Sequence, residues 1–129
     1  MGSTTADFLK YRVSTPTIGK WSSKFSAVKK FAINNNIPLI AIWSNGDACG
    51  HCLTLEKALM RKTFRTWMAS SNFVFYFGCC TDTSKDDKYE GIGFNWCRKN
   101  NLKQYPFVRV YWKNGKVDTA MTGDTLLNY

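Results

Sequence analysis

The sequence contains no apolar run that approaches the roughly 20 residues a membrane-spanning helix needs. Residues 1–7 are polar and lack the apolar core of a signal peptide, and alanine at position 6 leaves the myristoylation pattern incomplete. No internal repeat or low-complexity tract is present. We therefore expect a cytoplasmic protein without a membrane span, with packaging into a virus particle as the alternative.

Acidic residues are scarce. Asp and Glu number 9 against 18 Lys and Arg, which gives a formal net charge of +9. Basic residues dominate residues 1–36 and 98–116, whereas residues 82–90 are acidic. A basic balance can mark nucleic-acid binding, but no helix-turn-helix, finger or RNA-binding signature accompanies it here. We interpret the charge as solvated surface and do not predict a nucleic-acid partner.

Cysteine is present in an odd number. Five cysteines argue against a closed disulfide framework and suit a reducing compartment. The 129 residues are 44% hydrophobic and 16% aromatic, which argues against disorder and predicts one domain with a real hydrophobic core.

Residues 37–68 organise the chain. The almost wholly apolar run 39–43 predicts a strand buried on both faces, as in a parallel sheet. Apolar residues then recur at spacings of three to five, with basic residues between them, which predicts an amphipathic helix. These apolar residues are Leu55, Leu59, Phe64 and Trp67. The motif Cys49-Gly50-His51-Cys52 lies where the strand leads into this helix.

That position determines the chemistry expected of the motif. The first turn of a helix carries unpaired N–H groups and a partial positive charge, so Cys49 should have a lowered pKa and act as a nucleophile. Cys52 lies one turn further on and can attack a mixed disulfide formed at Cys49. His51, when protonated, favours the thiolate further, and Gly50 leaves the approach open. The simpler interpretation is an inert or metal-binding pair.

The rest of the chain alternates helices and strands. Residues 1–21 are predicted to be an arm interrupted by Pro16 and Gly19, and residues 22–129 the folded domain. Its first helix should begin near Ser22 or Ser23, either of which is a good N-cap, and end at residues 34–36. A second apolar strand is predicted over 73–77, a weaker helix over 91–101, and a strand over 107–112. Asn114-Gly115 predicts a two-residue hairpin leading to a strand over 117–121.

This arrangement resembles the thioredoxin-like superfamily over residues 22–122, and the Cys-Gly-His-Cys motif is most similar to the active site of protein disulfide isomerase domains. The resemblance implies an α/β, three-layer fold: a mixed central sheet flanked by helices. It implies a protein disulfide oxidoreductase that exchanges disulfides with protein substrates and needs no metal or organic cofactor. It also implies a cis peptide bond before Pro106, close to the cysteines, and pairing of substrate with the backbone of Tyr105.

Three departures from the family pattern favour a second interpretation. Ala48 replaces the tryptophan usually found before the first cysteine, after a longer loop at 45–47. Ala41 appears where the family has a buried acid that relays protons to the second cysteine. Residues 122–129 are too few for the terminal helix, so this helix is short or missing and a protein partner would cover the open sheet face. The alternative is therefore a non-catalytic binding or structural module of a larger assembly, a virus particle included.

Three cysteines lie outside the motif. Cys79 and Cys80 end a strand expected to run parallel to residues 39–43, which places them at the edge of the sheet that carries the motif. They could form an auxiliary redox pair or a zinc site with Cys49 and Cys52, but burial without function is the simpler interpretation. Cys97 is interpreted as a core residue.

Overall fold

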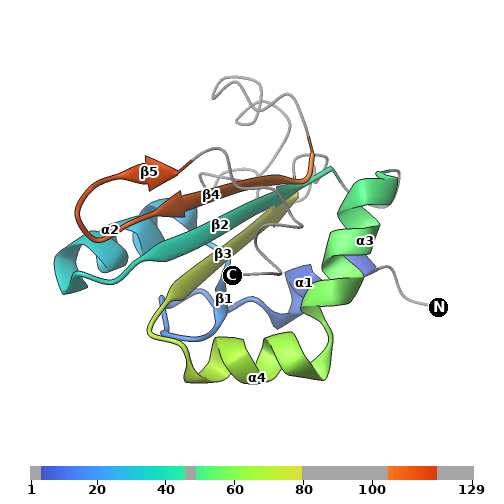
Figure 1. Cartoon of the computed structure of the whole chain (residues 1–129), viewed down its shortest axis with the longest axis horizontal. Coiled ribbons are helices and arrows are strands. Elements are labelled where there is room, and N and C mark those ends of the chain that lie inside the picture. The colour runs from blue at the N-terminus through green and yellow to red at the C-terminus, as the bar shows by residue number, and fades with distance from the viewer. Residues whose placement is uncertain (1–3, 46–48, 80–104, 119–129) are drawn as a thin grey trace.

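The computed structural model describes residues 4–45, 49–79 and 105–118. A five-stranded mixed sheet crosses the molecule in the order β1-β3-β2-β4-β5 (Figure 1). The strands are β1 (Trp21–Ser22), β2 (Leu39–Ser44), β3 (Val74–Cys79), β4 (Phe107–Tyr111) and β5 (Val117–Asp118). β1 and β2 run parallel to β3, whereas β4 is antiparallel to both β2 and β5. The mixed α/β architecture is the fold class predicted.

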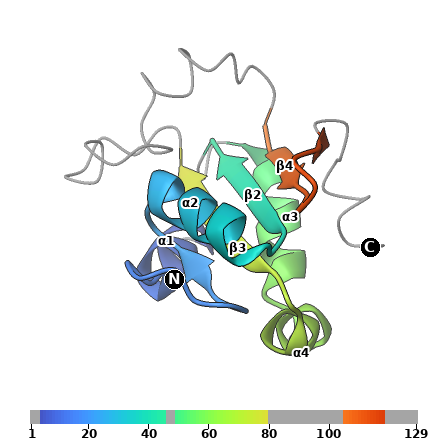
Figure 2. The same cartoon turned by 90° about the vertical axis from the view of Figure 1, so that its left-hand side faces the viewer.

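Helices pack on both faces of the sheet (Figures 1 and 2). They are α1 (Thr4–Tyr11), α2 (Phe25–Asn35), α3 (Gly50–Leu59) and α4 (Lys62–Ser70). Buried side chains of α1, α3 and α4 share one hydrophobic cluster with alternate residues of β2 and β3. Buried side chains of α2 share a second cluster with the intervening strand residues. The result is three layers with the sheet in the middle.

Strand β2 is the centre of this core, as its composition predicted. All six of its residues are buried. Ile40 and Ile42 face the α3 layer, whereas Ala41 and Trp43 face α2. Because successive residues of a strand point to opposite faces, an uninterrupted apolar run is what burial on both faces requires.

The predicted arm has regular structure in its described part. Residues 4–11 form α1 and residues 21–22 form the edge strand β1. Phe8 is 3% exposed and stacks on Phe77 of β3 at 4.6 Å between ring centroids. Pro16 and Gly19 therefore lie in the connection between two elements rather than in an irregular segment.

The start of α2 differs from the expectation because neither serine is available as a cap. Ser22 is paired with Tyr76 in the sheet, and the Ser23 hydroxyl donates to the carbonyl of Val13 at 3.3 Å. The helix begins at Phe25, after Lys24. Its end is as predicted: Asn36 adopts the left-handed conformation, φ 55°, and closes the last turn.

The single helix predicted after the motif is two helices. α3 ends at Leu59 and α4 begins at Lys62, with Arg61 extended between them. The spacing of five residues from Leu59 to Phe64 would place Phe64 about 140° away around one continuous helix at 3.6 residues per turn. The break redirects the chain so that Phe64 still packs against the core.

The hairpin has a three-residue loop instead of the predicted two-residue one. The amide of Gly115 donates to the carbonyl of Trp112 at 2.9 Å, and the amide of Trp112 donates to the carbonyl of Lys116 at 2.8 Å. Gly115 has φ 87°, while Asn114 is not among the described residues with positive φ. This is a turn completed by a left-handed glycine, and not the type I′ turn that needs two positive φ angles.

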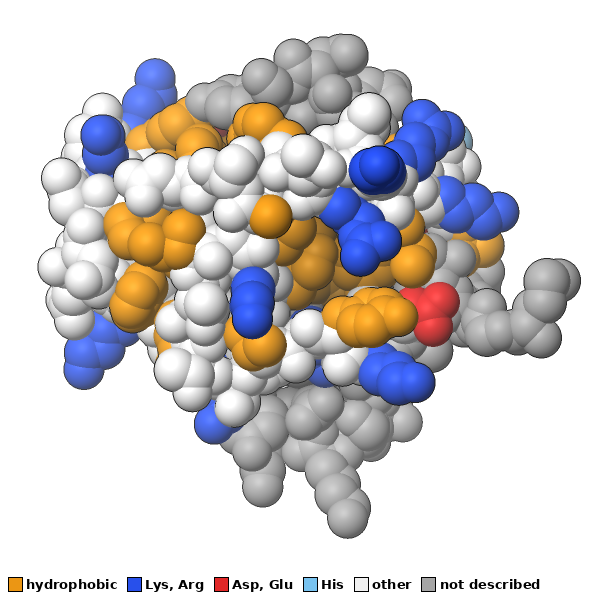
Figure 3. Space-filling model, turned by 90° about the horizontal axis from the view of Figure 1, so that it is seen from below, with side chains coloured by type: hydrophobic (Ala, Val, Ile, Leu, Met, Phe, Trp, Pro, Cys, Tyr) orange, Lys and Arg blue, Asp and Glu red, His pale blue; other side chains and the backbone are white. Residues whose placement is uncertain are grey.

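Several predicted features lie outside the described residues: the helix over 91–101, the end of the last strand, and the tail at 122–129 with the sheet face it was expected to leave open. Within the described ranges, no helix combines the length and the apolar character needed to cross a bilayer. Figure 3 shows one face, seen from the α4 side, on which Lys and Arg side chains are dispersed among hydrophobic and uncharged groups.

Candidate active site

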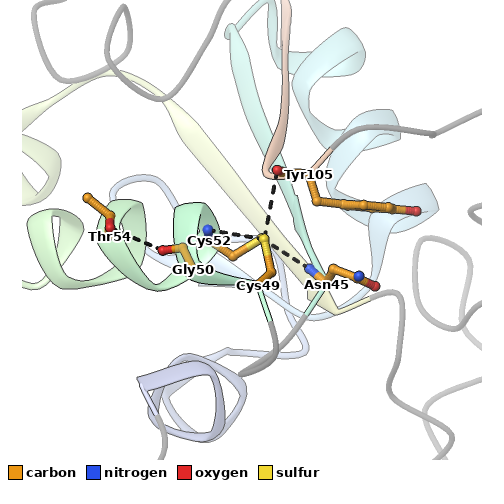
Figure 4. The surroundings of a disulfide bond; sticks show 6 residues. All are labelled: Asn45, Cys49, Gly50, Cys52, Thr54 and Tyr105. Carbon is orange, nitrogen blue, oxygen red and sulfur yellow. Dashed lines mark hydrogen bonds between the residues drawn. A yellow bond between two sulfur atoms is a disulfide. The ribbon is translucent and has the colours of Figure 1, made fainter.

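Cys49 forms the N-terminal cap of α3. Its backbone is extended, φ −101° and ψ 104°, and its sulfur accepts the N–H of Cys52 at 3.2 Å (Figure 4). Its carbonyl accepts the N–H of Leu53 at 3.1 Å, which starts the helical ladder. The sulfur therefore takes the place of the side-chain oxygen that usually satisfies a free donor at a helix start.

Cys49 and Cys52 form a disulfide with 5.2 Å between their Cα atoms. The two sulfurs differ in their access to water. Cys49 is half-buried, whereas Cys52 is 0% exposed on the core-facing side of α3. A partner can therefore approach Cys49 and cannot reach Cys52 directly.

Two backbone groups from other segments complete the surroundings of the pair (Figure 4). The N–H of Asn45, just after β2, donates to the Cys52 sulfur at 3.4 Å. The carbonyl oxygen of Tyr105, just before β4, lies 3.8 Å from the Cys49 sulfur. The bond between Tyr105 and Pro106 is cis, the geometry that the family resemblance implies.

These residues meet because of the register of the sheet. β2 and β4 are antiparallel neighbours with Trp43 opposite Phe107, so the end of β2 and the beginning of β4 lie at the same edge. The motif follows β2, and Tyr105 precedes β4. Burial raises the pKa of the Tyr105 phenol above its ordinary value, so this side chain stays neutral across the physiological range.

The remaining predicted site residues lie around this centre. Gly50 and His51 are exposed on the first turn of α3, and Pro106 is half-buried. A Cβ atom added at Gly50 would meet no heavy atom within 4 Å, so the space above the motif is open. Ala41 is 0% exposed in the cluster on the α2 face, so the position expected for a relay acid is apolar.

The cysteines outside the motif are only partly described. Cys79 ends β3 in register with Ser44, the last residue of β2, so its backbone lies at the edge that carries the motif, as predicted. Cys80 and Cys97 lie outside the described residues, and so does part of the auxiliary redox pair or zinc site considered as an alternative, since both include Cys80. Among residues 4–45, 49–79 and 105–118, no group of three or more His, Cys, Asp or Glu side chains could hold a metal ion.

Sequence reasoning noted Glu56 only as part of a Leu-Glu pattern after the cysteines, which resembles one branch of the thioredoxin-like superfamily, and gave it no role in the site. Glu56 is 1% exposed on α3. The signal was present: Glu56 follows Cys52 by four residues and lies between Leu55 and Leu59 on the apolar side of the helix. The charged character of glutamate makes solvent exposure the default expectation, and here that default is wrong.

No family model and no curated protein matches the sequence. Solved structures do match. A thioredoxin from Thermus thermophilus superposes with a TM-score of 0.53 at 13% identity, covering 80% of this chain and 74% of that one. The J-Trx1 fragment of ERdj5 superposes with a TM-score of 0.49 at 14% identity, over 78% of this chain and 44% of the fragment.

The chain therefore has a thioredoxin-like fold, as the sequence pattern indicated. Within that fold it carries a cysteine pair at disulfide distance at the start of a helix. These two features together suggest a redox function.

Proposed function

We propose that this protein is a thiol–disulfide oxidoreductase that exchanges disulfides with protein substrates through Cys49 and Cys52. The observation that carries the proposal is the contrast between the two sulfurs. Cys49 is accessible and accepts a backbone N–H at the start of α3, whereas Cys52 is buried one turn behind it. A cysteine pair needs this asymmetry to assign one nucleophile and one resolving thiol.

The exchange proceeds in two steps. The Cys49 thiolate attacks one sulfur of a substrate disulfide, and the other substrate sulfur leaves as a thiolate. Cys52 then attacks the Cys49 sulfur, the bond between Cys49 and the substrate breaks, and the substrate leaves fully reduced. The cysteine pair is oxidised to the disulfide. The same steps in reverse oxidise a substrate dithiol.

The local environment supports thiolate formation at Cys49. The Cys52 N–H and the other free donors of the first helical turn stabilise negative charge on its sulfur. His51 is exposed on the same turn, where its protonated form adds to this effect. Gly50 presents no side chain over the approach to the sulfur.

The segment before β4 is proposed to bind the substrate chain. The Tyr105 carbonyl lies 3.8 Å from the Cys49 sulfur, so an extended substrate held along this backbone would bring its own sulfur to Cys49. Hydrogen bonds between two main chains can hold an extended peptide with little dependence on its side chains.

Reduction of insulin disulfides by dithiothreitol, followed by turbidity, tests the proposal. The wild-type protein is expected to accelerate the reaction, and Cys49→Ser to abolish the acceleration because no nucleophile remains. Cys97→Ser, which changes a cysteine outside the motif, is the control and should retain wild-type activity.

Two results would contradict catalysis by Cys49. If the wild type and Cys49→Ser are both inactive while the protein elutes as a stable oligomer from a sizing column, the non-catalytic binding or structural module is the better description. Acceleration that persists in Cys49→Ser would show that the motif is not the site.

A further inference from the structure

Glu56 is an unusual residue to find inside α3. The buried residues of this helix are Cys52, Leu55, Glu56, Ala58 and Leu59. Glu56 is the one carboxylic acid among them and is 1% exposed. Moving a carboxyl group out of water is costly even when it is hydrogen-bonded, and an apolar side chain of similar size often stabilises a core equally well. Packing alone therefore does not account for an acid at this position.

The helix places Glu56 next to Cys52. Residues four apart lie on the same side of a helix with about 5–6 Å between their Cβ atoms. Long helical side chains lean toward the N-terminus, a direction that brings a carboxyl at position 56 toward the turn that contains Cys52. Both side chains are shielded from solvent, at 1% and 0% exposure.

The charged groups on the elements packed against α3 are mostly directed to water. Lys10 of α1 and the basic residues at the start of α4 are exposed. Asp7 and Arg12 are half-buried, and the Arg12 guanidinium donates to the carbonyl of Phe77 at 3.2 Å. The sheet contributes apolar side chains to this layer: Ile40, Ile42, Phe75, Phe77, Val108 and Val110.

Disulfide exchange by Cys49 and Cys52 requires a proton acceptor close to Cys52. Cys52 must lose its proton before it can attack Cys49, since the thiolate is the nucleophile. Its sulfur is not reached by bulk solvent. The N–H of Asn45 stabilises a negative sulfur but cannot accept a proton. Ala41, on the opposite face of the sheet, offers no acceptor either.

We propose that Glu56 accepts the proton of Cys52 when the mixed disulfide is resolved, and returns it when the pair is reduced. The proposal rests on the proposed function. In the resolving step the Cys52 S–H proton passes to the Glu56 carboxylate, directly or through one water. The Cys52 sulfur bonds to the Cys49 sulfur, and the bond between Cys49 and the substrate breaks. The electron pair leaves on the substrate sulfur, which takes a proton from solvent.

Single-turnover kinetics with oxidised glutathione test this role. The reduced protein is mixed with the disulfide, quenched with acid and N-ethylmaleimide, and digested with trypsin. Cleavage after Lys30 and Lys57 releases peptide 31–57, which contains both motif cysteines and no others. Mass spectrometry of this peptide separates the mixed disulfide from the Cys49–Cys52 disulfide, so formation and resolution are timed independently.

Glu56→Gln should slow resolution at pH 7 by at least about tenfold, in line with the usual contribution of a positioned general base. The difference from wild type should shrink above about pH 9, where a thiol ionises without a protein base. Formation of the mixed disulfide at Cys49 should stay within about twofold of wild type. Lys57→Gln removes a charge from the adjacent exposed position and should leave both steps unchanged. In this variant trypsin cleaves next at Arg61, so the peptide followed is 31–61, which also contains both motif cysteines and no others.

Wild-type resolution and an unaltered pH profile in Glu56→Gln would overturn the proposal while leaving the oxidoreductase function intact. An equal shift in Lys57→Gln would also overturn it, because the cause would then be the general charge of the helix. If Glu56→Gln does not fold, Glu56→Met, which is apolar and of similar length, is judged by the same criteria. A wild-type protein that forms no mixed disulfide would refute the proposed function itself.

Discussion

At the scale of single residues, the start of α3 gives the two motif cysteines different surroundings: Cys49 is half-buried and Cys52 is buried. A cysteine before a helix becomes its cap, and a second cysteine three positions later falls on the same side. Both features of Cys49 and Cys52 follow from this spacing. The burial of Glu56 could not be predicted in the same way, because it depends on α1 and the sheet covering one side of α3.

The thiolate character of Cys49 leads to a prediction at this scale. The reduced protein should be alkylated by iodoacetamide at Cys49 with a midpoint clearly below the ordinary thiol pKa of about 8.5. The Cys52 N–H and the helix start favour the charged sulfur. Alkylation of peptide 31–57, measured against pH by mass spectrometry, supplies the midpoint. A midpoint near 8.5 would remove the mechanistic basis for catalysis.

At the scale of elements, the existence and type of most described strands and helices followed from apolar patterning, but several boundaries did not. The helix after the motif breaks where the apolar spacing reaches five, and α2 begins late because Ser22 and Ser23 are committed to the β1 segment. The turn before β5 is determined by the left-handed conformation of Gly115. The Asn-Gly pattern predicted a two-residue loop, whereas the backbone forms a three-residue one.

The connection between α1 and β1 contains a position that accepts glycine alone. Gly19 has φ 78°, and a Cβ there would lie 3.0 Å from the carbonyl oxygen of Met68. Its N–H also donates to the carbonyl of Phe73 at 2.9 Å. Gly19→Ala should therefore lower the free energy of unfolding by about 1–3 kcal/mol, measured by urea titration.

Gly50→Ala is the matched control for this substitution. Gly50 lies at the start of α3 with no heavy atom near the added Cβ and without a positive φ. The same exchange there should leave the free energy of unfolding unchanged or raise it by up to about 1 kcal/mol. Equal losses at both positions would contradict the account of Gly19.

At the scale of the whole molecule, family resemblance predicted the fold class correctly, whereas it said nothing of the helix and the edge strand that the structure shows within the first 22 residues. Short elements leave little periodicity in a sequence. A single turn-rich segment with Pro16 and Gly19 gives no sign that α1 before it packs on the core. The half-buried Arg12 also joins this segment to β3 through the Phe77 carbonyl. These contacts join residues that are far apart in the sequence, so local sequence patterns cannot predict them.

The integration of α1 predicts a large effect of Phe8→Ala. Phe8 is 3% exposed and contacts the rings of both Trp21 and Phe77. Its truncation should lower the free energy of unfolding by about 3–5 kcal/mol in urea titration. Tyr11→Ala, on the same helix but 67% exposed, should change it by no more than about 0.5 kcal/mol. A loss below 1 kcal/mol for Phe8→Ala would instead indicate a loosely docked arm.

The unequal exposure of the two sulfurs has a consequence for how this protein meets other molecules. Every exchange that uses this pair begins at the Cys49 sulfur, because the Cys52 sulfur is buried on the core-facing side of α3. Any covalent adduct captured before the internal thiol acts must then be attached at position 49. While such a mixed disulfide lasts, the natural substrate is linked to the protein by a single disulfide bond at Cys49, and trapping that bond would identify the substrate.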